Sequence, residues 1–394
     1  MPYESTRARR PDTVNLDSAT QHSYEQLIAA EPVLGRVGHL ADLLPGVCEW
    51  TLFHAGPPFA APDSLPAPVA NAAVSAAMHA GFAATRENAL NDIASGAIRL
   101  RPAQDIGLVT PLAFVAGPGT FCLEVADANR DGLRRLAPLN DGPLPDALRF
   151  GTGRAEGLAL LRRLDGVVGP DLAQHAPQGA AMLPLLARGL AGGDDLHGHV
   201  AAAQAAFLDL AGRRISDETR AYMGDANQFV LNVVMATAAV MLGAAAGVAE
   251  SRMVVAAGGN GIDFGYKLAG APDDWVTLPA TAPQGPRFPG REAAAPLPAI
   301  GDSAAIDAVG FGAACLRFSP TLRQALEGHV DAAFFTDAAH EAFIGPHPRL
   351  GQSSLRVGLD LTCPRPCLGV MLGIVEATGT AGLIGRGVAP WPSA

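Results

Sequence analysis

A short polar segment, residues 192–199, brings two carboxylates and two imidazoles together in the sequence Gly-Gly-Asp-Asp-Leu-His-Gly-His. It directly precedes a helix that we expect around Phe207. Asp194 or Asp195 suits the N-cap of this helix, and the free N–H groups that follow a cap can bind a carboxylate or a phosphate. The segment therefore predicts either a structural cap or a ligand-binding or catalytic site containing Asp194 and His197.

The same segment could also bind a metal ion through Asp194, Asp195, His197 and His199. Positions i and i+2 do not share a helix face, however, and the sequence shows no matching third cluster of ligands. We therefore expect neither a metal nor a cofactor, and a metal-dependent amide hydrolase stays an alternative function.

A second candidate is the glycine-rich run Gly258, Gly259, Asn260 and Gly261, which follows an expected strand at residues 253–257. Successive glycines let backbone amides approach a ligand closely and form an anion-binding nest. The run lacks the Lys-Ser or Lys-Thr pair of a Walker loop and the spacing of a dinucleotide fingerprint. An anion site and a plain hairpin turn are both open interpretations.

Two polar loops flank a Pro- and Gly-rich connection at residues 283–298 and form a third candidate. Gln284 and Gly285 lie in the first loop, and Asp302 and Ser303 lie in the second. Their side chains can donate or accept directed hydrogen bonds from an amide or a carboxylate. Ser303 lacks the G-x-S-x-G context of a nucleophile, so loop capping is the alternative role.

The apolar run at residues 229–249 is long enough to span a bilayer, but alanine and glycine dominate it. Asp225 precedes the run, and Glu250 and Arg252 follow it, which favours a buried central helix and no membrane span. Asn232 must find a hydrogen-bond partner inside such a helix, so it either braces the core or contacts a ligand.

Composition excludes several classes of protein. Of the 394 residues, 49% are hydrophobic and 17% are charged, which predicts large cores and a surface shared with partner subunits. The net charge is −10 with a single lysine, Lys267, so nucleic-acid binding is not expected. The basic cluster at residues 7–10 is expected to be a solvated tail.

The five cysteines are an odd number in a chain whose N-terminus lacks the apolar core of a signal peptide. We therefore expect a cytoplasmic protein. Cys363 and Cys367 have the wrong spacing for a zinc or thioredoxin-like motif.

The pattern of elements predicts an α+β, multi-domain fold with mixed α and β ends around a mostly helical middle. The expected divisions are residues 1–150, 151–250 and 251–394. Within the first part, residues 24–44 have apolar side chains at helical spacing, with an interruption at Pro32.

Several ordered stretches together resemble the YlbE-like family, a domain of unknown function that includes the large subunit of oxamate carbamoyltransferase of allantoin catabolism. The resemblance covers nearly the whole chain. Its stretches are His54-Ala55-Gly56-Pro57-Pro58, Asn140-Asp141-Gly142, Arg149-Phe150-Gly151, Gly193-Asp194 with His197, Gln228-Phe229 with Leu231-Asn232, Asn260-Gly261 with Phe264-Gly265, Pro283-Gln284-Gly285 and Gly301-Asp302-Ser303.

The resemblance implies a homo-oligomer that works beside other subunits and binds a small ureido acid and phosphate. The implied reaction is attack of phosphate on the carbamoyl carbon of oxalurate, which releases oxamate and carbamoyl phosphate. Within it, the glycine-rich run at residues 258–261 is expected to hold an anion, Arg149 to pair with a carboxylate or phosphate, and His197 to transfer a proton.

The chain also departs from the family pattern. Asp195 replaces a glutamate, His199-Val200 replaces Arg-Asn, Gly259 replaces an arginine, and Glu376-Ala377 replaces His-Lys. Lost cations weaken an inherited anion site. The chain is therefore expected to be a divergent member, and a non-catalytic ligand-binding or assembly subunit is the second candidate function.

Overall fold

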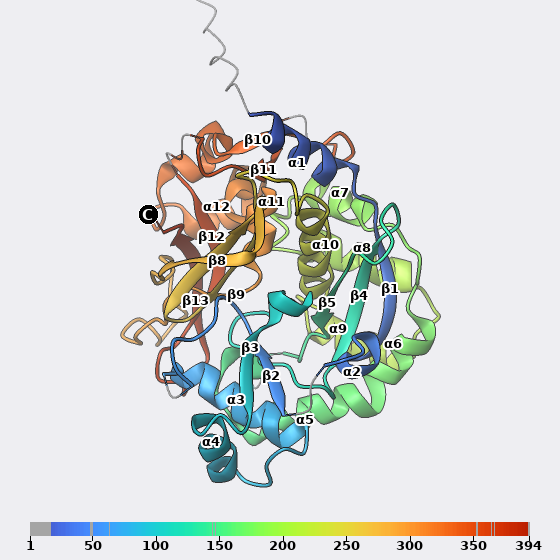
Figure 1. Cartoon of the computed structure of the whole chain (residues 1–394), viewed down its shortest axis with the longest axis vertical. Helices are drawn as coiled ribbons and strands as arrows, with labels where there is room; N and C mark the ends of the chain where they lie inside the picture. The colour runs from blue at the N-terminus through green and yellow to red at the C-terminus, as the bar shows by residue number, and fades with distance from the viewer. Residues whose placement is uncertain are drawn as a thin grey trace, which may run out of the picture.

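The computed structural model describes residues 17–47, 50–62, 64–143, 145, 147–351, 354–363, 365 and 367–392 (Figure 1). The basic cluster at residues 7–10 and Cys48 lie outside the described residues. Helices and several small sheets are mixed along the chain, which confirms the predicted α+β class.

The α-helices are α1 Ser18–Ala29, α2 Leu40–Leu43, α3 Ala67–His79, α4 Arg86–Ala94, α5 Ala155–Arg163, α6 Gly169–His175, α7 Leu183–Ala191, α8 Ala201–Ala211, α9 Asp217–Asp225, α10 Val230–Ala244, α11 Ala304–Val309 and α12 Pro320–Leu326. The strands are β1 Pro32–His39, β2 Thr51–His54, β3 Arg99–Pro102, β4 Phe121–Asp127, β5 Arg134–Pro138, β6 Val254–Asn260, β7 Asp263–Leu268, β8 Ala271–Pro279, β9 Ile300–Gly301, β10 Phe343–Pro346, β11 Arg356–Leu359, β12 Gly369–Val375 and β13 Leu383–Pro390. Short 3-10 and π segments join them.

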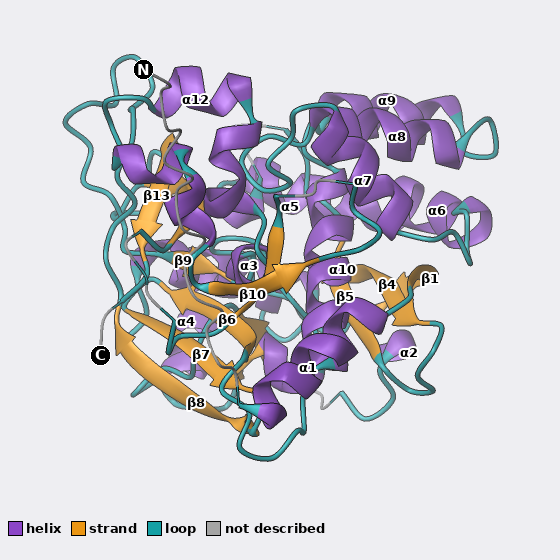
Figure 2. Ribbon diagram, turned by 90° about the horizontal axis from the view of Figure 1, so that it is seen from above, coloured by secondary structure: helices purple, strands orange, loops and turns teal. Residues whose placement is uncertain are grey.

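Two sheets enclose the centre of the molecule. Strands β1, β4 and β5 form an antiparallel sheet in the order β1-β4-β5, and the four-stranded sheet has the order β8-β7-β6-β9. Helix α10 contacts β4 and β5 on one side and β6 on the other. Figure 2 shows α10 between these sheets, with α6 to α9 grouped above α10 and above strands β1, β4 and β5 in that view.

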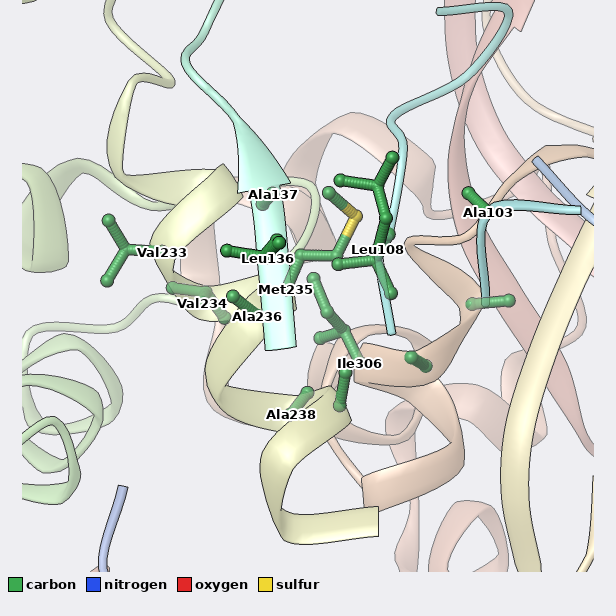
Figure 3. Packing of buried hydrophobic residues seen from close by; sticks show 14 of the residues in the cluster. Ala103, Leu108, Leu136, Ala137, Val233, Val234, Met235, Ala236, Ala238 and Ile306 are labelled. Carbon is green, nitrogen blue, oxygen red and sulfur yellow. The ribbon is translucent and has the colours of Figure 1, made fainter. Parts of the chain in front are cut away.

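The centre of the core is α10, as the apolar run predicts. All of its 15 residues are buried except Leu231 and Gly243. Figure 3 shows Met235 of this helix packed near Leu108, Leu136 and Ile306, while Val233 points away from them on the other side of the helix. Burial on every face explains why the helix is hydrophobic all round.

No single described helix is long and apolar enough to cross a membrane. Helices α9 and α10 satisfy the length and composition criteria only as a pair, and this pair is bent by 80°.

The expected helical stretch at residues 24–44 is wrong at residues 32–39, whereas α1 and α2 on either side are helical. Helix α1 ends at Ala29, and residues 32–39 form β1, which pairs with β4. Val33 and Val37 favour a strand, and the edge offered by β4 satisfies the backbone of this segment.

One apolar cluster contains residues from all three predicted parts of the chain, including Leu27, Val233 and Leu372. The division into three domains stays a prediction.

Candidate functional site

A pocket with an empty volume of about 630 Å³ lies where the start of α10, the loop between α7 and α8, and the β12–β13 hairpin meet. Its polar lining residues are Asn140, Arg149, His197, Gln228, Asn232, Ser303 and Arg386. None of the described residues that line it is acidic. A concave, mostly apolar lining with a few converging polar groups is typical of a small-molecule site.

The structure brings four of the predicted site residues to this pocket: Arg149, His197, Asn232 and Ser303. The other predicted residues lie behind the lining or away from it.

His197 is held by a buried carboxylate. Its Nδ1 lies 2.7 Å from Oδ2 of Asp307, and both side chains are almost completely buried. The other oxygen of Asp307 accepts hydrogen bonds from the amides of Ala313 and Met371, at 2.8 and 3.0 Å. Because Asp307 accepts at Nδ1, the neutral imidazole carries its proton there, and Nε2 is available at the pocket.

The loop that carries His197 is organised by Asp195. This carboxylate accepts from the amides of His197, Gly198 and His199, at 3.1, 3.1 and 2.7 Å. Burial raises the pKa of Asp195, while the three amides oppose that rise. Leu196 has a φ of +67°, a conformation that costs about 1–3 kcal/mol for a residue other than glycine. Asp195 therefore holds a strained turn that presents His197.

Asp194 acts as a helix cap and does not line the pocket. Its oxygens accept from the amides of Ala202 and Ala203 in the first turn of α8, at 3.2 and 2.8 Å. His199 Nδ1 lies 3.0 Å from Asp194 Oδ1. Burial raises the pKa of Asp194, against the effect of these partners. Asp194 thus has the geometry of a helix cap. Its catalytic role stays a prediction.

Arg149 is a cation with most of its donors already used. Its guanidinium donates to Asn140 Oδ1 at 3.1 Å, to Gly142 O at 2.9 Å and to Asp141 Oδ1. It also lies over the ring of Phe150, 4.5 Å from the centroid. Arg149 therefore braces one wall of the pocket as half of a buried ion pair with Asp141.

Arg386 is the less neutralised cation. It lies in β13, and its Nη1 donates to Gly198 O at 3.3 Å. No carboxylate among the described residues forms an ion pair with it. The guanidinium has five N–H donors, so several of them remain for an anionic ligand.

Asn232 provides a hydrogen-bond acceptor, whereas Arg386 provides donors. Its amide nitrogen donates to Pro138 O, and its buried Oδ1 has no partner among the described residues. An unsatisfied buried acceptor is costly, and a ligand N–H can satisfy it. The pocket thus combines a free cation at Arg386 with a free acceptor at Asn232.

Asp302 lies behind Ser303 and ties separate segments together. It accepts from Gly56 N at 2.8 Å, Gln104 Nε2 at 2.7 Å and both Thr110 N and Oγ1, at 2.9 and 3.1 Å. Burial raises the pKa of Asp302 to about 7, against the effect of these hydrogen bonds. Since Thr110 leads into Leu112, a lining residue with a φ of +47°, Asp302 supports a second strained turn at the pocket.

The glycine-rich run belongs to a sheet. Gly258, Gly259 and Asn260 are part of β6, which is longer than expected and pairs with β7 and β9. The amide of Gly261 donates to Ala299 O at 3.1 Å. A Cβ on Gly258 would lie 2.6 Å from Asp302 Oδ1, so this glycine permits close packing. None of the four residues lines the pocket, and their anion-binding role stays a prediction.

Gln284 and Gly285 lie beside β13. Gln284 exchanges backbone hydrogen bonds with Val388, both at 2.9 Å, and its side chain is exposed. A Cβ on Gly285 would lie 2.1 Å from Arg386 O. This segment therefore supports the backbone of Arg386 and does not line the pocket.

Asp307 and Arg386 are not among the site residues predicted from the sequence. Asp307 is the one charged residue of α11, an otherwise apolar helix, and a buried charge of that kind needs a partner. Arg386 lies between two glycines in an apolar strand. Both are isolated charges in apolar elements, and that signal could have identified them.

The four side chains considered as metal ligands, Asp194, Asp195, His197 and His199, do not converge on one point. Asp194 and Asp195 turn to separate sets of backbone amides, and His197 pairs with Asp307. Among the described residues, no group of three or more His, Cys, Asp or Glu side chains could hold a metal ion.

These features define an α+β protein with a pocket that is lined by two arginines and adjoins a buried His–Asp pair. A family model described as oxamate carbamoyltransferase subunit AllG matches residues 98–303, just over half of the chain. The chain therefore belongs to this family. The resemblance that the ordered stretches predicted is confirmed at this level, and the YlbE-like name stays a prediction.

Individual relatives are similar over most of their length. The chain is 26% identical over 383 residues to the oxamate carbamoyltransferase subunit AllG of Escherichia coli K12, covering 93% of this chain and 88% of that protein. It is 24% identical over 372 residues to the uncharacterized protein YahG of the same strain, covering 90% and 78%.

A crystal structure of a conserved protein of unknown function from Enterococcus faecalis V583 has the same fold. It superposes with a TM-score of 0.86 at 23% identity, covering 95% of this chain and 94% of that chain.

Proposed function

We propose that the chain is a carbamoyltransferase-like subunit that binds a small ureido acid in the pocket beside His197. The observation that carries the proposal is the pairing of His197 with buried Asp307 at a pocket that contains two arginines and no acidic lining residue. The match to the AllG family supports the carbamoyl-transfer chemistry.

The reaction that fits this family is phosphorolysis of oxalurate in purine and allantoin nitrogen catabolism. A phosphate oxygen attacks the ureido carbon, and the bond from that carbon to the nitrogen of the oxamate part breaks. The proton of hydrogen phosphate moves to the leaving nitrogen, so the products are carbamoyl phosphate and oxamate. This chemistry requires positioning, charge stabilisation and one proton transfer, and it needs no protein nucleophile.

The lining residues match the parts of such a substrate. Arg386 pairs with the carboxylate through its unused donors. Asn232 Oδ1, which lacks a partner, accepts from an N–H of the ureido group. Ser303 and Arg149 complete the walls, with Arg149 adding positive potential although its donors are engaged.

His197 is the group that moves the proton. Asp307 fixes the imidazole orientation and stabilises the imidazolium if Nε2 takes up the proton. Nε2 faces phosphate and the leaving nitrogen in this proposal, so the same atom can accept the proton from one and deliver it to the other.

Partner subunits complete the proposed complex. The name of the related AllG protein describes it as a subunit, and the proposal places this chain in a homo-oligomer that associates with other subunits. If the chain supplies only ligand binding or assembly, Arg386 and Asn232 retain their roles and His197 loses its catalytic one.

Calorimetric titration of the isolated chain with oxamate and oxalurate tests the binding step. An Arg386→Gln variant should bind both compounds at least about tenfold more weakly, because a charge-assisted contact is lost. Absence of binding to the unaltered chain would overturn the proposed substrate class.

Reconstitution with partner subunits tests catalysis. Oxalurate and phosphate should yield carbamoyl phosphate, and His197→Gln should abolish the yield while oxamate still binds. If the His197→Gln complex retains full activity, the chain is a binding or assembly subunit.

A further inference from the structure

A second pocket lies toward the other end of α10. It has an empty volume of about 450 Å³ and is lined by Gln104, Leu108, Val109, Arg135, Ala239, Gly243, Ala246, Val255, Ala256, Lys267, Pro272 and Ala305. Gly243 is one of the two residues of α10 that are not buried, and the other, Leu231, lines the first pocket. Each pocket thus includes one incompletely buried residue of α10 together with one buried residue, Asn232 at the first pocket and Ala239 at the second.

Arg135 is the main cation of this second pocket. It lies in β5 and donates from Nη1 to Arg134 O at 2.9 Å. No carboxylate among the described residues forms an ion pair with it. Burial lowers the pKa of its guanidinium, and no neighbouring acid opposes that shift. Its other four N–H donors have no hydrogen-bond partner among the described residues and can meet a ligand.

Lys267 adds a second positive charge and is the only lysine of the chain. Its Nζ lies 2.7 Å from Asp105 Oδ1 and 4.9 Å from the ring centroid of Trp275. Trp275 Nε1 donates to the same Asp105 oxygen at 2.9 Å. The carboxylate of Asp105 thus neutralises Lys267. None of the described residues that line the pocket is acidic, so none neutralises Arg135.

We propose that this second pocket binds a small oxyanion, with inorganic phosphate as the probe of that class. Arg135 holds the anion through the fork of its guanidinium, and Lys267 adds a second positive charge to the same wall. Gln104 lies beside them with its Nε2 engaged by Ala257 O and Asp302 Oδ1. Burial of a cation without an anionic partner is unfavourable, and a bound anion offsets that cost. The site is separate from the proposed substrate pocket and does not depend on the function assigned to it.

A purely structural role for Arg135 is the competing explanation. The C-terminal end of α10 is negative, and a nearby arginine could offset it. Arg130 already donates to Ala244 O at this end of the helix. The two explanations differ in outcome, because only the proposed site binds phosphate.

The test is calorimetric titration with inorganic phosphate of the full chain carrying Arg386→Gln, which weakens anion binding in the first pocket. This variant should still bind phosphate. Adding Arg135→Gln should weaken the binding at least about tenfold. If the single variant is folded and binds no phosphate, or if Arg135→Gln changes nothing, the proposal is overturned.

Gly243→Ala provides a second variant that favours folding of the helix. A Cβ at this position would lie 2.6 Å from Arg135 Nη2, so the guanidinium must leave its present place. Gly224→Ala in α9 is the matched control, because no atom lies within 4 Å of its added Cβ. Phosphate binding in the Arg386→Gln background should fall with Gly243→Ala and persist with Gly224→Ala. Equal binding by these two variants would contradict the proposal.

Discussion

His197 Nδ1 lies 2.7 Å from Asp307 Oδ2, although 110 positions separate the two residues in the chain. The loop after α7 carries the imidazole and α11 carries the carboxylate. Asp307 is itself fixed by the amides of Ala313 and Met371, so the imidazole orientation is set by three segments.

Asp307→Asn should release the orientation of His197. An asparagine can present N–H in place of the acceptor, so the imidazole proton moves from Nδ1 toward Nε2. Nitrogen NMR of His197 should show the Nδ1–H tautomer in the unaltered chain and a changed tautomer in the variant. In a reconstituted complex, kcat should fall by about 10²-fold or more. An unchanged His197 spectrum would contradict this arrangement.

Arg149→Gln and Arg386→Gln should have opposite consequences. Arg149→Gln leaves Asp141 buried without its partner, so the free energy of unfolding should fall by about 3–5 kcal/mol. Arg386→Gln breaks no ion pair and should leave unfolding by denaturant nearly unchanged while weakening oxamate binding. If Arg386→Gln is the more destabilising change, the assignment of these roles is wrong.

Asp302 should make the protein less stable as the pH rises from about 4 to 7. Its pKa is raised to about 7 in the folded chain, so the folded state binds a proton that the unfolded state has lost. The contribution of Asp302 to the free energy of unfolding is fully present below the pKa that this carboxyl has in the unfolded chain. It decreases by up to about 4 kcal/mol as the pH rises through this range. Asp302→Asn should remove this slope in unfolding free energy measured against pH, and an identical slope in both proteins would refute the prediction.

Glu376 should have the reverse dependence at lower pH. Burial raises its pKa, but hydrogen bonds from Thr378, Thr380 and Ala381 outweigh burial and lower the pKa to about 2. Its contribution is therefore present above the unfolded pKa near 4.5 and is lost as the pH falls toward 2. Glu376→Gln should cost up to about 3 kcal/mol at pH 7. Chemical unfolding measured at pH 7 and at pH 2.5 should show a smaller difference in unfolding free energy between the unaltered chain and the Glu376→Gln variant at the lower pH.

Part of the fold follows from local sequence alone. The apolar run at residues 229–249 predicted a buried central helix because polar side chains are nearly absent on every face, and α10 has that burial. By contrast, residues 32–39 carry a pattern that suits a helix or a strand, and pairing with β4 decided the matter. Gly258 and Gly259 suggested a turn, but the neighbouring strands extended β6 through them.

The sequence by itself determined the kinship of the chain, because short motifs in a fixed order carry family information without any knowledge of contacts. It also identified Arg149, His197, Asn232 and Ser303, which the structure brings to one pocket. Only the tertiary structure paired His197 with Asp307 and brought Arg386 to Gly198 O, across 188 positions. Contacts at such separations depend on how the whole core packs around α10, and local residue patterns carry no record of that packing.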